Sequence, residues 1–437
     1  MTRFKKITAL LYLLSLIISA SAQDLLTPED AVAYAVKNNY DIILAKNEAD
    51  ILRINNNKGA AGMLPKINVT TGDVFNLSNI HQELSTGTVT NKNWVPVNSF
   101  NAGLNLNWTA FDGLKMFATK DRLQALQVLG ELQLKEQIQN TIAQTLAAYF
   151  EIVRQKQQLK AMYEWVKLYE ERVNLSQKKL DVGYSDKTPL LQAQVDLITQ
   201  KAAIVKQDFV LQQSKAVLNN LLSRDAETGF DVIDTFAMNY QADLQQLKDT
   251  TLNNFSILSA QKNIDIAKLQ HKEITAQKLP IINFSTGYNF NQNNSKAGLQ
   301  LVNRSYGPTV GINAVIPIYN GGIIKKQLEA SAVNIAVKEL VVSQLKNDLQ
   351  QKVYNAYKNY EYAKTVLKLN EDAVKTADEN VQLSMQRFRL NQTTTLEVKT
   401  AQSSYEMALF NVILARYTAK LAEIELRRLT DNFVQIK

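Results

Sequence analysis

The side chains that most often carry catalysis or hold metals are scarce in this chain. Its 437 residues include no cysteine and two histidines, His81 and His271. The absence of cysteine excludes disulfides, thiolate metal sites and cysteine catalysis. Neither histidine has a second ligand at a metal-binding spacing, and no Gly-rich phosphate loop, calcium loop or zinc-binding spacing occurs. The composition therefore weighs against an enzyme and predicts no metal site and no cofactor.

The charge of the chain gives little reason to expect a nucleic-acid ligand. Lys and Arg outnumber Asp and Glu by 49 to 41, which gives a formal net charge of +8. This excess is spread along the chain, and no basic stretch is interleaved with aromatic side chains as in a nucleic-acid-binding surface. We therefore expect a mixed, solvated surface and no binding of nucleic acid.

The N-terminal residues have the features of a secretory signal peptide. A basic head precedes an apolar run from Ile7 to Ile18, and Ala20-Ser21-Ala22 supplies the small residues of a cleavage site. The apolar run is shorter than the ~20 residues that a membrane-spanning helix needs. We therefore predict that residues 1–22 are removed and that the mature chain leaves the cytoplasm.

The rest of the chain consists of two similar halves. Asn38-Asn39-Tyr40 matches Asn253-Asn254-Phe255, and Phe111-Asp112-Gly113 matches Tyr319-Asn320-Gly321 at a slightly smaller offset. Matches that recur in one order at a nearly constant offset indicate an internal duplication. The predicted parts are a first repeat at 23–223, an equatorial linker at 224–242, a second repeat at 243–431 and a C-terminal tail at 432–437.

Each half contains two stretches in which apolar and polar side chains alternate. Phe284, Tyr288 and Phe290, for example, are separated by asparagine, serine and glycine residues. A period of two is typical of a strand with one apolar and one polar face. Four strands are predicted, at about 66–77, 99–110, 281–291 and 308–318. Polar loops are expected between the members of each pair, at about 78–99 and 291–308.

A helical period follows the second strand of each half. Leu345, Leu349 and Val353 belong to a stripe whose steps of three and four residues continue among Gln, Lys and Glu. Helical hairpins are predicted at about 114–223 and 322–429. Gly113 and Gly183 are as far apart along the sequence as Gly321 and Asn391 are. At about 1.5 Å per residue each first helix would be roughly 105 Å long, so the two hairpins should reach equally far.

Strands of this kind suit a membrane, but four of them cannot close a barrel. A tilted membrane-spanning strand has about 9–11 residues, with apolar side chains toward lipid and polar ones toward a lumen. About eight strands is the smallest number known to close such a barrel, and unpaired sheet edges are not tolerated in hydrocarbon. We therefore expect the barrel to be completed by oligomerisation.

Several short motifs occur in a fixed order along the mature chain. They include the opening Leu26-Thr27-Pro28-Glu29-Asp30-Ala31-Val32, the Gly62-Met63-Leu64-Pro65 run, and the Leu-x-x-Leu pairs at 218–221 and 426–429. Together with Phe111-Asp112-Gly113 and its counterpart, they resemble the TolC-like family of outer-membrane efflux and secretion ducts. The resemblance covers essentially the whole mature chain.

The resemblance implies a fold, a location and partners. The fold is an α+β membrane protein built from a duplicated unit of two strands and a long helical hairpin. Three protomers would form a 12-stranded β-barrel in outer-membrane lipid that continues into a 12-helix α-barrel in the periplasm. This homotrimer would export substrates delivered by an inner-membrane transporter through a periplasmic adaptor, which is a membrane fusion protein.

The resemblance also implies two kinds of functional residue. The adaptor would contact the helical tips, formed by Val182, Gly183, Tyr184, Ser185, Leu390, Asn391, Gln392 and Thr393. The family closes its periplasmic aperture with acidic residues six and nine positions after the second tip's glycine, which is Asn391 here. Those positions hold Glu397 and Thr400, so one of the two acids is present. Without the family, Glu397 would be read as a solvated surface residue, and Gly183 and Asn391 as ordinary turn residues.

Two other classes of function compete with a passive export duct. A periplasmic coiled-coil scaffold would account for the long helices, but it leaves the four amphipathic strands unexplained. An enzyme would need a convergent set of titratable groups, which the motifs do not supply. The sequence therefore favours the duct.

Overall fold

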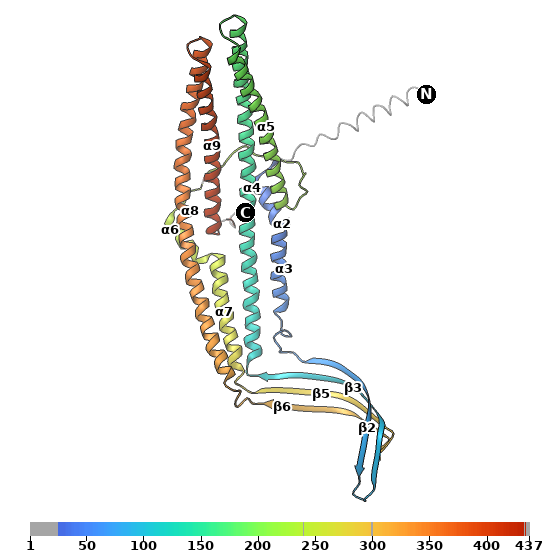
Figure 1. Cartoon of the computed structure of the whole chain (residues 1–437). Coiled ribbons are helices and arrows are strands. Elements are labelled where there is room, and N and C mark those ends of the chain that lie inside the picture. The colour runs from blue at the N-terminus through green and yellow to red at the C-terminus, as the bar shows by residue number, and fades with distance from the viewer. Residues whose placement is uncertain (1–24, 239, 299, 432, 434–437) are drawn as a thin grey trace, which may run out of the picture. The chain divides into compact units, whose positions relative to one another are not determined.

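The computed structural model describes residues 25–238, 240–298, 300–431 and 433 (Figure 1). The predicted signal peptide at 1–22 lies outside the described residues, as does the predicted tail at 432–437 apart from Phe433. Two compact units are present. The helical unit comprises the chain up to Lys46, Gln133–Ile257 and the chain from Gln344 onward, and the sheet unit comprises Asn47–Leu132 and Leu258–Ser343. Each unit therefore contains parts of both predicted repeats.

The elements follow the same order in the two halves of the chain. In sequence they are β1 (Leu25–Leu26), α2 (Pro28–Asn38), α3 (Tyr40–Asn55), β2 (Lys66–Glu83), β3 (Val89–Asp112), α4 (Lys115–Asp181), α5 (Thr188–Leu221), β4 (Asp231–Val232), α6 (Leu244–Thr250), η1 (Thr251–Asn253), α7 (Phe255–Ala276), β5 (Ile281–Ser295), β6 (Val302–Val315), α8 (Ile323–Arg389) and α9 (Thr395–Leu429). Both α4 and α8 have 67 residues, so the two long helices are equal in length.

The sheet unit is built on four antiparallel strands in the order β2-β3-β5-β6, which leaves β2 and β6 as its edges. The strands are longer than the apolar alternation predicted. β2 and β3 stay paired from Ser78↔Val95 to Glu83↔Val89, so most of the loop expected at 78–99 is strand. The same holds for the loop expected at 291–308, because β5 extends to Ser295 and β6 begins at Val302. The loops were predicted too long because their side chains are polar. Backbone pairing does not depend on apolar side chains and continues wherever both strands stay extended.

The other end of the last strand is shorter than predicted. The alternation indicated a strand as far as residue 318, but β6 ends at Val315. Pro317 follows two residues later, and a proline has no N–H group to donate to a neighbouring strand. The apolar pattern therefore continues past the point where backbone pairing ends.

The rest of the sheet unit is helical and comprises α3 from Asn47, α7 from Leu258, and the first turns of α4 and α8. A small core of Ala125, Leu129 and Ile266 joins α4 to α7. Gly130 lets α3 approach α4 closely, because a Cβ atom there would lie 2.7 Å from Leu52 Cδ1. This is the single glycine in the long stretch that the sequence predicts as helix before Gly183, and its small size has a packing reason.

The helical unit contains the rest of α4 and α8 together with α5 and α9. Its main core includes Tyr149, Phe150 and Ile152 of α4, packed with Phe230 and Val232. The segment 224–242, predicted as a linker, therefore packs on α4 through those two residues. The side chain of Asp231 in β4 forms an ion pair with Lys156 Nζ at 2.7 Å. Among the described residues, no helix is long and apolar enough to cross a membrane.

Candidate functional site at the helical tips

The connections α4–α5 and α8–α9, here called the first and second tip, lie at the same end of the helical unit (Figure 1). At the first tip the N–H of Gly183 donates to the carbonyl of Leu180 at 2.9 Å, and the N–H of Tyr184 donates to that of Lys179 at 2.8 Å. Gly183 has a φ of +74°, the left-handed conformation that glycine adopts without steric cost. These bonds form a Schellman-type helix ending that satisfies the last free carbonyls of α4.

The second tip repeats the hydrogen bonds of the first. The N–H of Asn391 donates to Phe388 O at 3.2 Å, and the N–H of Gln392 donates to Arg387 O at 2.8 Å. Asn391 has a φ of +60°. Asparagine is one of the few other residues that tolerate this conformation, which explains how it replaces the glycine of the first tip.

Both tips expose apolar side chains. Val182 is 76% exposed at the first tip, and Leu390, at the corresponding place of the second tip, is 66% exposed. Tyr184 and Leu396 are also largely exposed. Exposed large apolar side chains that lie close together are typical of a surface that meets another protein.

Glu397 lies in the first turn of helix α9, whose N-cap is Thr394. The N–H of Glu397 donates to Thr394 Oγ1 at 3.3 Å, and its carboxylate accepts a hydrogen bond from the hydroxyl of Thr393. A threonine N-cap followed three residues later by glutamate is the capping-box sequence pattern, so residues 394–397 could have predicted the start of α9. The carboxylate nevertheless stays exposed. Thr400 is exposed as well, and its hydroxyl donates to Leu396 O at 3.0 Å.

Behind the tips a buried ionic network joins the two hairpins. Arg172 of α4, whose side chain is 1% exposed, pairs with Asp196 of α5 and donates to Gln402 Oε1 of α9 at 3.0 Å. Lys399 of α9 also pairs with Asp196, at 2.9 Å. Burial by itself raises the pKa of Asp196, but hydrogen bonds from Lys399 and Gln192 and the Arg172 charge hold it below its ordinary value. Asp196 is therefore an anion held by two cations.

Further contacts join α4 to α8. Arg389 pairs with Glu171, and Lys179 Nζ donates to Phe388 O at 2.9 Å while lying 3.5 Å from the centre of the Phe388 ring. Burial lowers the pKa of Lys179. Sequence reasoning missed this network, because a polar residue on a long helix looks the same whether it faces solvent or another helix.

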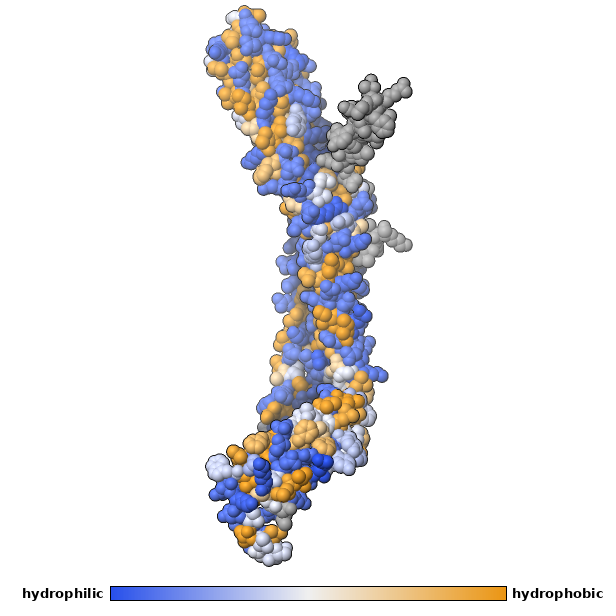
Figure 2. All heavy atoms as spheres, turned by 90° about the vertical axis from the view of Figure 1, so that its right-hand side faces the viewer, coloured by the Kyte–Doolittle hydropathy of each residue, from blue (hydrophilic) through white to orange (hydrophobic). Residues whose placement is uncertain are grey.

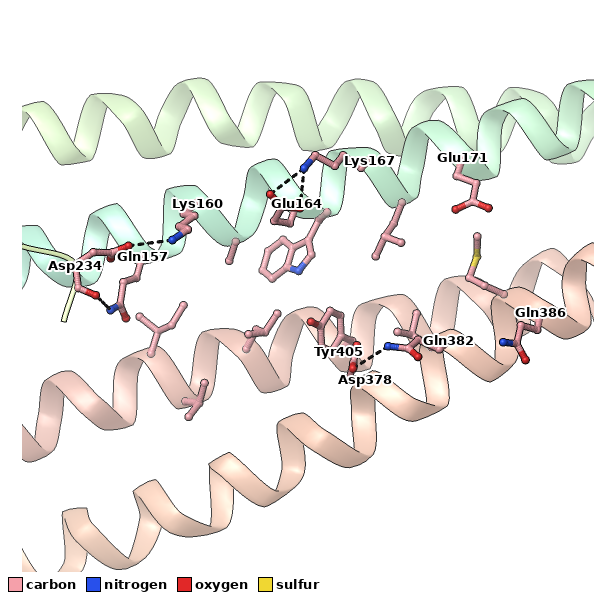
Figure 3. Close-up of a pocket in the computed structure, with 18 of the residues that line it drawn as sticks. Gln157, Lys160, Glu164, Lys167, Glu171, Asp234, Asp378, Gln382, Gln386 and Tyr405 are labelled. Atoms are coloured by element: carbon pink, nitrogen blue, oxygen red, sulfur yellow. Dashed lines mark hydrogen bonds and ion pairs between the residues drawn. The ribbon is translucent and has the colours of Figure 1, made fainter. Parts of the chain in front are cut away.

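A cavity of about 750 Å³ lies between α4 on one side and α8 and α9 on the other. In Figure 3 the labelled charged groups lie spread along the helices, and several of them pair with a close neighbour. Lys160 pairs with Asp234 at 3.1 Å, Lys167 pairs with Glu164 at 2.8 Å, and Gln382 donates to an Asp378 oxygen at 2.9 Å. No group of three or more His, Cys, Asp or Glu side chains in the described part of the chain could hold a metal ion. The arrangement can join helices and present a surface, but it does not assemble catalytic groups.

Comparisons with known proteins agree with this geometry. The model of the family described as outer membrane efflux protein matches residues 33–224 and 247–432. The outer membrane efflux protein BepC of Brucella suis is 22% identical over 335 residues, which are 76% of this chain and 72% of BepC. The proteases secretion protein PrtF of Dickeya chrysanthemi is 22% identical over 334 residues, which are 72% of this chain and 68% of PrtF.

The fold is also similar to that of solved structures. The CmeC outer membrane channel of Campylobacter jejuni superposes with a TM-score of 0.78 at 15% sequence identity. That similarity covers 93% of this chain and 85% of CmeC. At this level of identity the comparison establishes the fold.

Proposed function

Because the chain belongs to the outer membrane efflux protein family, we propose that three copies form a passive duct across the outer membrane. Membership confirms the resemblance inferred from the motifs. Members of this family are outer-membrane channels and not enzymes, and the present protein is accordingly located in the outer membrane. The trimer, the two barrels, the partners and the site residues are what we propose beyond this.

The observation that carries the proposal is a sheet with one exposed apolar face and two edges that no strand of the described chain covers. Val69, Val310 and Ile312 are each more than 70% exposed, at 77%, 72% and 75%. The edge strands β2 and β6 each have one unpaired side, which a hydrocarbon environment does not tolerate. Pairing β2 of one copy with β6 of the next would satisfy them. Three copies would then close a 12-stranded barrel with its apolar face toward lipid.

The exposed side of α5 supports assembly in the helical part. Its apolar side chains Leu191, Val195, Ile198, Val205 and Phe209 are 49–71% exposed. Their spacing of four, three, seven and four residues is that of a coiled-coil seam. Hydrophobic patches interrupt the hydrophilic surface of the end of the helical unit that carries α5 (Figure 2). We infer that this seam packs on a helix of the neighbouring copy, so that twelve helices form the periplasmic barrel.

The tips are the proposed contact with the periplasmic adaptor. They lie at the end of the hairpins, their turns are held by backbone hydrogen bonds, and they expose Val182, Tyr184 and Leu390. Gly183, Ser185, Asn391, Gln392 and Thr393 complete the two turns. An inner-membrane transporter would deliver the cargo through the adaptor. The names of BepC and PrtF indicate efflux for one relative and protease secretion for the other.

Glu397 and Thr400 are the proposed aperture gate. In a trimer the exposed Glu397 would bring three carboxylates to the axis, where like charges repel and attract cations. A ring of this kind cannot hold the entrance shut, so hydrogen bonds between neighbouring tips would have to do so. A periplasmic scaffold remains the alternative reading, but it would leave the apolar face of the sheet in water.

The orientation of the duct tests the proposal in intact cells. Ser85 lies in the turn between β2 and β3, and Ser185 lies in the first tip. Because the chain has no cysteine, Ser85→Cys and Ser185→Cys each introduce one thiol. A membrane-impermeant thiol reagent should label Ser85→Cys from outside and leave Ser185→Cys unlabelled until the outer membrane is opened. Labelling of Ser185→Cys alone would contradict the proposed polarity.

A further inference from the structure

The polar face of the sheet is built from asparagine and glycine in a repeating arrangement. The pairing register places three rows of four residues across β2, β3, β5 and β6, beginning at Asn68, Thr70 and Gly72. The asparagines of these rows are Asn68, Asn101, Asn105, Asn289 and Asn291. The glycines are Gly72, Gly103, Gly287 and Gly307. Thr70, Thr309 and Ser305 fill the remaining positions, so the twelve positions hold neither a charged nor a large apolar side chain.

Contacts between strands show that these side chains share one face. Asn105 Nδ2 donates to Thr70 Oγ1 at 3.2 Å, and Asn289 Nδ2 donates to Thr309 Oγ1 at 3.1 Å. Each of these two asparagines also lies across a glycine of the neighbouring strand. A Cβ atom on Gly287 would lie 2.6 Å from Asn105 Oδ1, and one on Gly103 would overlap Asn289 Oδ1. The amides therefore lie along the wall and are partly hydrogen-bonded to it.

None of the twelve positions is charged, and two of the charged residues of the four-stranded part lie on the other face. Asp73 and Arg304 are paired with Phe100 and Gln292, which belong to the opposite, apolar face. Alternation therefore removes these two charges from the polar face. Lys66, at the first position of β2, does share the polar face, where it pairs with Asn107 in the row before Asn68 and so marks one end of the three neutral rows.

The absence of charge matters in a narrow aqueous bore. Rings of charged side chains select ions of opposite sign in channels, and a fixed charge acts over a Debye length of ~8–10 Å. Amides and hydroxyls that are hydrogen-bonded to the wall exert no comparable field. Because a glycine has no side chain, the neighbouring asparagine side chain can lie flat over it, and the polar face projects less far into the bore.

We propose that this face lines the outer-membrane bore of the duct as a charge-neutral wall that passes polar cargo of either sign. Selection of cargo by charge is then made in the helical unit. This inference rests on the proposed function, because it requires the polar face to be turned into a water-filled barrel.

The test measures the electrostatic potential at the wall with a single thiol. Asn101→Cys, Asn289→Cys and Gly307→Cys are made one at a time, and a Cβ at Gly307 meets nothing within 4 Å. The purified protein in detergent reacts with methanethiosulfonates of similar size that carry either a trimethylammonium or a sulfonate group. The ratio of the two rates is divided by the same ratio for 2-mercaptoethanol. A neutral wall should give a value within about threefold of one, whereas a potential of several kT would shift it more than ~10-fold.

Two matched variants calibrate the measurement. Ser305→Asp, added to Asn289→Cys, places a carboxylate two positions along the neighbouring strand and should favour the cationic reagent several-fold. Ala102→Cys lies on the opposite face, where it pairs with Phe290, and it should react with neither reagent in the detergent-covered trimer.

The outcomes separate the inference from the proposed function. Reactive thiols with a corrected ratio near one support the neutral wall. Reactive thiols with a ratio shifted more than tenfold in either direction overturn the inference and leave the water-filled barrel intact. Thiols on the polar face that react with neither reagent, while Ala102→Cys reacts with both, would overturn the inference and the proposed barrel together.

Discussion

The two tips close with the same backbone turn but differ in the side chains around it. Gly183 and Asn391 both adopt the left-handed conformation. The backbone hydrogen bonds within the first tip join the same pair of positions as those within the second tip. The start of the next helix differs. At the first tip Asp186 accepts from the N–H of Thr188 at 2.8 Å, and at the second tip the Thr394 hydroxyl accepts from the N–H of Glu397 at 3.3 Å. The duplication therefore preserves the turn, whereas the charge beside it is free to change.

The ends of the hairpins opposite the tips also keep the backbone conformation and differ in side chain. Ser223 follows α5 and Asp431 follows α9 at equivalent positions of the two copies, with φ values of +54° and +52°. Asp431 accepts a hydrogen bond from the N–H of Phe255 at 2.8 Å and so caps α7. Both ends of the hairpin therefore keep the left-handed backbone conformation in the two repeats, while the side chains at these positions differ.

The largest expected effect on stability comes from the buried ionic network that joins the first repeat to the second within one chain. Arg172→Met removes one of the two cations that hold Asp196. Loss of one partner of a buried ion pair costs about 3–5 kcal/mol, and we expect the low end because Lys399 stays paired with Asp196. The thermal unfolding temperature of the purified protein should fall, and amide exchange near the tips should rise. Lys201→Met is the matched control, because its pair with Glu170 is half-exposed and should change stability by at most ~1 kcal/mol.

An exchange of the two turn residues should have a smaller effect. Gly183→Ala places a Cβ in the left-handed conformation, which costs about 1–2 kcal/mol for a residue other than glycine. Asn391→Gly should instead stabilise the second tip, since it makes that tip like the first. Hydrogen exchange at Tyr184 and Gln392 would report each tip separately. Equal protection in the two variants would contradict the role given to the left-handed residue.

The pH dependence of stability should distinguish the end of α9, where Asp431 stands, from the end of α5, where Ser223 stands. Burial first, and the Glu136 charge in addition, raise the pKa of Asp431 from 3.8 to about 6, against the opposing bond from Phe255. A raised pKa means that the ionised form is disfavoured in the folded protein, so stability is fully present below pH 3.8 and falls as pH rises through about 6. The unfolding temperature should therefore be higher at pH 5 than at pH 7.

Asp431→Asn keeps an oxygen acceptor for the N–H of Phe255 and removes the charge. The difference between pH 5 and pH 7 should shrink in this variant, and its unfolding temperature at pH 7 should rise. Ser223→Asn, at the matching position of the first copy, should leave the pH dependence unchanged. A dependence that survives Asp431→Asn would assign it to another group.

The smallest expected effect on stability belongs to Glu397. Glu397→Gln removes the charge and keeps an acceptor for the Thr393 hydroxyl, so assembly should not change. Block of the channel by divalent cations in planar bilayers should weaken, and the preference for cations should fall. Unchanged block in Glu397→Gln would leave this residue with its hydrogen bond to Thr393 alone.

The sequence predicted those features that depend on side-chain period and on turn residues. The alternation around Phe284 and Leu104 indicated strands, and Gly183 marked the end of α4. Strand length was not predictable in the same way, because the paired segment from Ser78 to Glu83 is polar and its backbone bonds leave no trace in hydropathy. The partners of Arg172 were also hidden, since they lie far away in sequence on other helices.

The central claim is that three copies complete one duct, and the mass of the extracted particle tests it most directly. The protein is purified from the outer-membrane fraction in a mild detergent and weighed by native mass spectrometry. The account predicts a particle of three chains that dissociates only when the detergent is made denaturing. Recovery of single chains in aqueous buffer, without detergent, would contradict it.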